Sequence, residues 1–269
     1  YAQDEIRVSD RFRAVAGLRF DYHGATSAES DFVASPRIGG VYLPSESVSL
    51  RASVSGGYRA PSAAEQYTET TQFGFDVIPN LALTGERAWS GEIGTTAQVG
   101  GWLRLDGAVF YSDFRDLIEP SPVAGQFFTF QFQNVSKARV FGLDTGAQVG
   151  VLGDQLGFKV NYLFLNSRDE RTGESLPYRS PHNLTVTVSA FRDLVAVDYL
   201  FRSEVEEVLA YPLDPRGPIS VVDLRLSYRF GNWVVMGKVA NLLQSKYVDI
   251  QERNPGASRL FRLTIMPRF

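Results

Sequence analysis

Residues that could hold a ligand gather between positions 59 and 75. A guanidinium and a carboxylate there could make charge-assisted hydrogen bonds, and aromatic rings could stack on an apolar ligand surface. These residues are Arg59, Glu65, Gln66, Tyr67, Phe73 and Phe75. The same residue types also suit a long loop that packs against itself and places aromatic side chains at an interface, and this is the simpler of the two interpretations.

Covalent and metal chemistry have little support in the sequence. There are no cysteines, which excludes disulfides, thiolate metal ligands and a thiol nucleophile. The two histidines, His23 and His182, are remote in sequence, so we expect solvated histidines and no metal site. His182 with Asp113, Asp116 or Ser180 could form a hydrolase site, but no spacing identifies a nucleophile. We therefore expect no catalytic residues, no cofactor and no enzyme activity.

The elements that carry these residues are expected to be β-strands, because apolar and polar residues alternate along much of the chain. Between positions 222 and 230 every even residue is apolar or aromatic and every odd residue is polar. A similar pattern occupies residues 12–22, 48–59, 184–190 and 195–202. One face of each strand would meet lipid or a core and the other would meet water. Polar faces this charged suit the interior of a wide membrane barrel better than the core of a small soluble sandwich.

The composition allows a membrane barrel and argues against a helical membrane protein and a nucleic-acid-binding protein. The 269 residues are 44% hydrophobic and 21% charged, without a run of 18 or more apolar residues that could cross a bilayer as a helix. The aromatic content of 13% suits the girdles of a barrel, although it would also suit a soluble sandwich. A net charge of -3 gives no basic surface for nucleic acid.

The connections between the expected strands alternate in length. Short turns rich in Gly, Asn, Asp and Pro are expected near residues 9–10, 44–46, 100–101, 153–154, 192–193 and 231–232. Longer links are expected near residues 23–30, 61–85, 120–127, 170–180, 208–218 and 244–257. These connections give about thirteen strands, and alternation of short turns with long loops is typical of outer-membrane barrels.

The last strand carries a possible assembly signal. Phe261, Leu263, Ile265 and Phe269 share one parity, and the chain ends on the last of these aromatic residues. This pattern resembles the C-terminal signature of bacterial outer-membrane β-barrels, in which the last strand seals the barrel and is read by the assembly machinery. The resemblance implies an outer membrane of a Gram-negative bacterium, with the C-terminus in the periplasm.

Four stretches, in order, resemble the C-terminal barrel of TonB-dependent outer-membrane receptors. Residues 57–62 read GYRAPS, residues 79–81 and 86–90 read PNL and ERAWS, residues 133–144 read QNVSKARVFGLD, and residues 239–247 read VANLLQSKY. The chain departs from the family pattern at Ser136, at Leu243 and Gln244, and at Pro267. A proline removes a donor from the strand ladder, so Pro267 affects how the final strand pairs. In this family Gly142 and Asn241 are expected to shape strand ends or bulges.

The resemblance implies an all-β protein, an antiparallel transmembrane β-barrel of which residues 1–269 supply about thirteen of 22 strands. It implies a receptor for TonB-dependent active uptake of a siderophore, cobalamin, haem or a glycan. The expected partners are outer-membrane lipid, an N-terminal plug domain and the TonB-contacting segment, neither recognisable here, the TonB complex and the barrel assembly machinery. A passive porin-like barrel is the alternative.

The resemblance also bears on a row of arginines expected on the inward face of the strands. These are Arg13, Arg19, Arg51, Arg59, Arg202, Arg225 and Arg229. They could contact an anionic substrate. In this family such charges more often contact the plug, and that is the expectation here.

Overall fold

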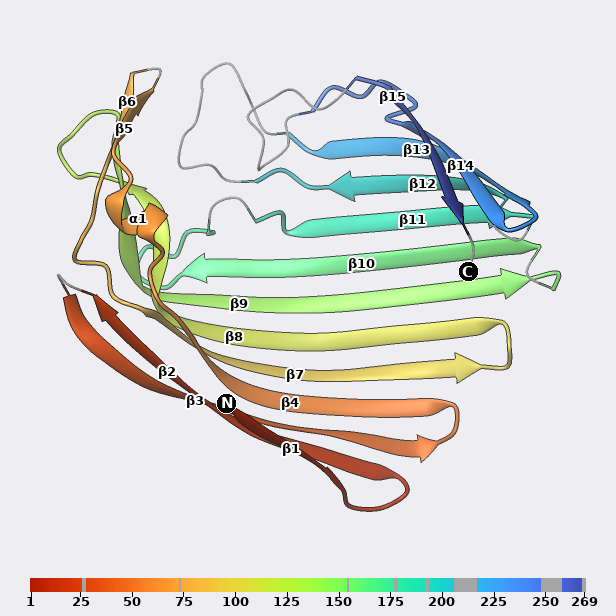
Figure 1. Ribbon diagram of the computed structural model, residues 1–269, viewed down its shortest axis with the longest axis horizontal. Coiled ribbons are helices and arrows are strands. Elements are labelled where there is room, and N and C mark those ends of the chain that lie inside the picture. Colours follow the sequence, from red (N-terminus) through yellow and green to blue (C-terminus); the bar gives the residue numbers. More distant parts are fainter. Residues whose placement is uncertain are drawn as a thin grey trace.

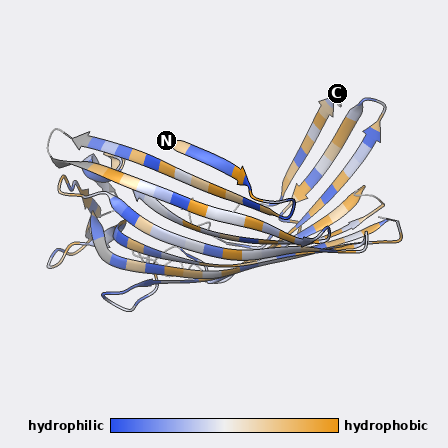
Figure 2. Ribbon diagram, turned by 90° about the horizontal axis from the view of Figure 1, so that it is seen from below, coloured by the Kyte–Doolittle hydropathy of each residue, from blue (hydrophilic) through white to orange (hydrophobic). Residues whose placement is uncertain are grey.

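The computed structural model describes residues 1–25, 28–72, 74–153, 155–176, 179–191, 194–205, 217–247 and 258–267. Within this part of the chain, thirteen strands follow one another in one antiparallel sheet, in the order β1-β2-β3-β4-β7-β8-β9-β10-β11-β12-β13-β14-β15 (Figure 1). The expected count of about thirteen strands is confirmed. The sheet is open, with β1 at one edge and β15 at the other. Figure 2 shows a curved sheet whose first and last strands rise on the same side, near the labels N and C.

The strands have the following bounds: β1 (Ala2–Arg7), β2 (Phe12–Ala25), β3 (Ala28–Ser45), β4 (Val48–Arg59), β7 (Glu86–Val99), β8 (Leu103–Pro122), β9 (Thr129–Val151), β10 (Leu156–Asp169), β11 (His182–Ala190), β12 (Val195–Arg202), β13 (Ile219–Phe230), β14 (Trp233–Ala240) and β15 (Leu260–Pro267). Between β4 and β7 the chain forms the short helix α1 (Ala63–Tyr67) and two short strands, β5 (Thr70–Gln72) and β6 (Phe75–Ile78). In the described residues, no helix has the length and apolar character needed to cross a bilayer.

The sheet has an apolar face and a polar face, as the alternation predicts. In β13 the even residues Leu226, Tyr228 and Phe230 are exposed, and the odd residues Arg225 and Ser227 project from the opposite, polar face. In most of the other strands, large exposed apolar residues also recur at every second position, on even numbers in β2 and β4 and mainly on odd numbers in β7, β8 and β15. A wall one layer thick has little interior of its own, so exposed apolar side chains of this kind fit contact with lipid.

Most of the expected turns and links are confirmed. Short turns join the strands at one end of the sheet and longer connections join them at the other, at the right and left of Figure 1. The long link expected at residues 23–30 is wrong, because β2 continues to Ala25 and β3 begins at Ala28. The ladder pairs His23 with Asp31 and Ala25 with Ala28, and backbone pairing of this kind does not require apolar side chains. Residues 154 and 192–193, and most of the links 208–218 and 244–257, lie outside the described residues.

Two strands reach far beyond the length that a bilayer requires. β8 has 20 residues and β9 has 23, whereas a membrane-spanning strand needs about 9–11. Their extensions project at the long-loop end, where β6 pairs in parallel with β9 through Asp76 and Thr129. We call these extended ends of β8 and β9 the projecting hairpin. The candidate site lies against it.

Gly142 and Asn241 have different structural roles. Asn241 shapes a strand end as expected: it follows β14 with a φ of 50° and is almost fully buried. Gly142 does not form a bulge, because it pairs in regular register with Phe110 on one side and Leu165 on the other. A Cβ at this position would lie 2.1 Å from the Phe110 ring, so the glycine makes room for an aromatic side chain.

Candidate functional site

Arg59 is held by two carboxylates at the long-loop end of the sheet. It ends β4 directly opposite Glu86, the first residue of β7. Arg59 Nε and NH2 donate to Glu86 Oε2 and Oε1, both at 2.6 Å, and NH1 donates to both carboxylate oxygens of Glu65 at 2.9 Å. All three guanidinium nitrogens are therefore engaged within the protein.

Glu65 belongs to a capping box that starts α1. The Ser62 hydroxyl accepts from the Glu65 amide at 3.3 Å, and Glu65 Oε2 accepts from the Ser62 amide at 2.7 Å. Burial disfavours the charged carboxylate, but the hydrogen bonds from Arg59 and Ser62 outweigh it and lower the pKa of Glu65 below its ordinary value. The carboxylate thus joins the helix start to the end of β4.

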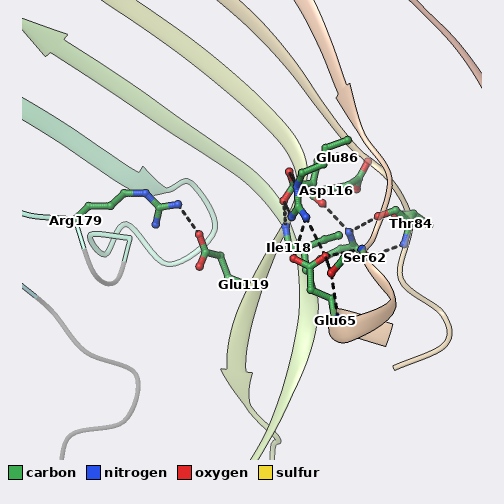
Figure 3. Close-up of polar contacts among 10 residues, drawn as sticks. Ser62, Glu65, Thr84, Glu86, Asp116, Ile118, Glu119 and Arg179 are labelled. Carbon is green, nitrogen blue, oxygen red and sulfur yellow. Dashed lines mark hydrogen bonds and ion pairs between the residues drawn. The ribbon is translucent and has the colours of Figure 1, made fainter. Parts of the chain in front are cut away.

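Glu86 extends the same network into β8. It is buried, and its Oε1 also accepts from the amide of Ile118 at 2.8 Å. Asp116, two residues before Ile118 in β8, has a positive φ of 58°. We call the group formed by Arg59, Glu65, Glu86 and the Ile118 amide the Arg59 latch; it ties the loop after β4 to three strands (Figure 3).

Amide side chains fasten the rest of this loop to β9. Asn134 Nδ2 donates to the carbonyl oxygens of Thr84 at 3.0 Å and Asp116 at 2.6 Å, and its Oδ1 accepts from the Thr84 amide at 3.0 Å. Asn80 Nδ2 donates to the Phe132 carbonyl at 2.8 Å. Both asparagines lie in stretches that the sequence singled out, but their partners, between 18 and 52 positions away, could not be read from it.

The candidate ligand residues therefore fall into two groups. Arg59 and Glu65 are joined in the latch. Gln66 is buried beside them, and its backbone carbonyl accepts from the backbone amide of Asn80. Tyr67 is exposed at the end of α1. Phe75 lies in a separate aromatic cluster, 5.4 Å from Phe128 and 5.9 Å from Phe130 between ring centroids. Phe73 lies outside the described residues.

A cavity of about 560 Å³ opens between the projecting hairpin and the loop after β10. Acidic side chains line much of it, including Glu119, Asp169 and Glu174. Glu119 is held by Arg179, whose NH2 donates to its Oε1 at 2.7 Å (Figure 3). These residues were not singled out from the sequence, and the only signal available was their position in, or directly next to, the expected long links at 120–127 and 170–180.

Several arginines of the inward row have nearby carboxylates that sequence reasoning missed. Arg19 pairs with Asp21 at 2.8 Å, and Arg51 pairs with Glu92 at 2.9 Å. The nearest approaches of two others are 4.0 Å, from Arg13 to Glu5 and from Arg225 to Asp198. Arg229 has no ion-pair partner among the described residues, and Arg202 is engaged within the protein.

The residues considered for catalysis make other contacts. His182 Nδ1 lies 2.8 Å from the Tyr162 hydroxyl, and the Ser180 hydroxyl donates to the Ser203 carbonyl at 3.1 Å. Asp113 lies 3.9 Å from the guanidinium of Arg139. No cluster of three or more metal-ligating side chains occurs in the described ranges.

The expected assembly signal lies on the exposed edge strand. Phe261, Leu263 and Ile265 are each more than half exposed on one face of β15. Phe269 lies outside the described residues. Pro267 ends the strand opposite Trp233, so its missing donor falls at the last rung of the ladder.

Known proteins resemble this chain in sequence and in fold. Residues 1–242 match the family described as TonB dependent receptor-like, beta-barrel. A hemoglobin and hemoglobin-haptoglobin-binding protein of Haemophilus ducreyi is 26% identical over 169 residues, which cover 55% of this chain and 17% of the relative.

Solved structures share the fold at low identity. The ferric enterobactin receptor of Pseudomonas aeruginosa has a TM-score of 0.74 at 20% identity, covering 99% of this chain and 44% of the receptor. The copper transporter OprC has a TM-score of 0.79 at 17% identity, covering 98% and 46%. The siderophore receptor PirA of Acinetobacter baumannii has a TM-score of 0.70 at 16% identity, covering 98% and 44%. The chain thus spans less than half the length of these proteins.

Proposed function

The chain belongs to the TonB-dependent receptor-like β-barrel family, and from this we propose that it forms the C-terminal part of an outer-membrane receptor for TonB-dependent uptake of a scarce substrate. The match of residues 1–242 is the observation that carries the proposal. The exposed apolar face and the charged polar face support it, because a membrane barrel needs lipid outside and tolerates charge inside.

We propose that the long loops lie outside the cell and that the short turns and the C-terminus lie in the periplasm. The lengths of the connections support this orientation, since outer-membrane barrels have short periplasmic turns and longer external loops. The polar face would then line the lumen and meet an N-terminal plug domain. Outer-membrane lipid, the TonB complex and the barrel assembly machinery complete the proposed partners.

The substrate classes considered are siderophores, cobalamin, haem and glycans. Relatives named for haemoglobin, ferric enterobactin and copper favour a substrate that carries a metal. The proposal involves no covalent chemistry, so the protein would act as a receptor and transporter and not as an enzyme.

Within the external end, we propose that Tyr67 and Phe75 contact the substrate and that Arg59, Glu65 and Gln66 hold the loop that presents them. The engagement of every Arg59 guanidinium nitrogen supports this division, because a ligand would have to displace an existing charge-assisted bond. Tyr67 is exposed and has no such constraint.

Uptake in cells tests the proposed function. The full-length protein is expressed in a strain that lacks its other uptake receptors, with and without TonB, and growth is measured on ferric siderophores, haem, cobalamin and glycans supplied singly. Growth on one substrate only when TonB is present is the expected result. Uptake that is independent of TonB, together with a large steady conductance in planar bilayers, would favour the porin alternative.

A further inference from the structure

A groove of about 850 Å³ lies on the polar face beside the short turns, and its charges are not balanced. Side chains of β10, β12 and β13 line it, near the right-hand end of these strands in Figure 1. Among the described residues, its charged lining consists of three cations, Lys159, Arg225 and Arg229, and one carboxylate, Asp198. We call this feature the short-turn groove.

Asp198 neutralises the groove only in part. Its Oδ1 already accepts from the Thr187 hydroxyl at 2.8 Å, and the same oxygen is 4.0 Å from Arg225 NH2, too far for a hydrogen bond. Arg225 Nε is shielded from solvent without a hydrogen-bond partner. Lys159 and Arg229 have no ion-pair partner in the part of the chain that the structure describes.

The arrangement differs from that of other charged side chains on this face. Arg51 donates to Glu92 at 2.9 Å, and Arg104 donates to Asp106 at 3.0 Å, so each of these cations has its own carboxylate. In the short-turn groove the surplus is positive, although the whole chain has a net charge of -3. A concave surface with surplus charge of one sign concentrates ions of the other sign.

We propose that the short-turn groove binds an anionic solute that carries carboxylate or phosphate groups. Lys159 and Arg229 supply the charged donors, and the hydroxyls of Ser189 and Ser227 in the lining supply neutral ones. This proposal rests on the proposed function and orientation, in which the short-turn end opens to the periplasm. A transported anion would meet these cations on its way out of the lumen.

Binding of citrate to the full-length receptor in detergent, measured by isothermal titration calorimetry, tests this proposal. The Lys159→Gln/Arg229→Gln variant removes two cations that pair with no carboxylate of the described ranges, so folding should be retained. The matched control, Arg13→Gln/Arg37→Gln, removes two cations from the same face at β2 and β3. Citrate affinity should fall by about tenfold or more in the groove variant and stay within about twofold of wild type in the control, with a weaker difference at high salt.

Two results would overturn the proposal. Equal loss of affinity in both variants would show that citrate responds to the general potential of the polar face. No binding to the wild type, with Lys159 protected from a water-soluble acylating reagent, would show that polypeptide fills the groove. The uptake assay with and without TonB is scored separately on the wild type. If uptake depends on TonB and either citrate result is negative, only the proposal for the groove is rejected. If uptake does not depend on TonB, the proposed function is rejected.

Discussion

The ring of Phe110 lies over Gly142, its direct cross-strand neighbour on the polar face. A Cβ at position 142 would come within 2.1 Å of the ring, which leaves no space for any other residue without movement. The aromatic ring takes the place of the missing side chain and covers the backbone of β9. This contact gives a physical reason for a glycine within the stretch 133–144.

Gly142→Ala should destabilise the barrel, because the added methyl group forces the Phe110 ring out of its position. Overpacking of this kind costs about 1–3 kcal/mol in the free energy of unfolding. Urea unfolding in lipid vesicles measures the effect. Gly107→Ala is the matched control, since a Cβ there meets nothing within 4 Å. If displacement of the ring is the cause, removing the ring should restore stability. The double variant Gly142→Ala/Phe110→Ala should therefore lose little free energy of unfolding relative to Phe110→Ala alone.

Glu86→Ala should release the Arg59 latch. The buried carboxylate of Glu86 accepts from Arg59 and from the Ile118 amide, and a hydrogen bond to a charged group is worth about 1.5–3 kcal/mol. Hydrogen exchange should show the Ile118 amide losing its protection in the variant. Glu92→Ala removes the carboxylate of the more exposed pair with Arg51 and should cost no more than about 1 kcal/mol. Similar exchange at Ile118 in both variants would contradict the latch.

The Arg59 latch should also weaken in acid. The pKa of Glu65 is lowered in the folded protein, so its contribution to stability is fully present above the unfolded value of 4.5 and is lost as the pH falls through the folded value. Protection of the Glu65 and Gln66 amides in α1 should therefore decline only at a pH below 4.5. Glu65→Gln removes this titrating group, and protection in the variant should be lower and should change less with pH over the same range, because only the Glu86 carboxylate of the latch remains.

The strand pattern and the strand count could be predicted because period-2 alternation is a local property of the sequence. The cross-strand contacts could not, because they depend on register. Arg59 meets Glu86 only because β4 and β7 pair with these two residues opposite each other. The error at residues 23–30 has a related cause, since the ladder from His23 to Asp31 continues by backbone pairing where the side-chain pattern gives no signal.

Asn241 should prove structural and not ligand-binding. Its Oδ1 accepts from the Ser245 amide at 2.8 Å, its Nδ2 donates to the Ser245 carbonyl at 2.9 Å, and its own amide donates to Asp223. Its φ of 50° adds a backbone preference for asparagine or glycine. Asn241→Ala should lower the free energy of unfolding by about 1–3 kcal/mol. Asn241→Gly keeps the backbone preference and loses the side-chain bonds, so the difference between the two variants measures the backbone strain less the entropy that glycine adds to the unfolded chain.

The assignment of faces can be tested at two adjacent residues of β13. Leu224 shares the parity of the exposed apolar residues Leu226 and Tyr228, whereas Arg225 lies on the polar face. If the apolar face meets lipid, Leu224→Arg places a charge near the middle of the bilayer and should reduce the free energy of folding in vesicles by about 2–4 kcal/mol. Arg225→Leu changes a side chain that does not meet lipid, and its nearest carboxylate is already 4.0 Å away, so the loss should be much smaller. Equal losses in the two variants would mean that the faces are not divided between lipid and water, and the barrel interpretation of the whole sheet would fail with them.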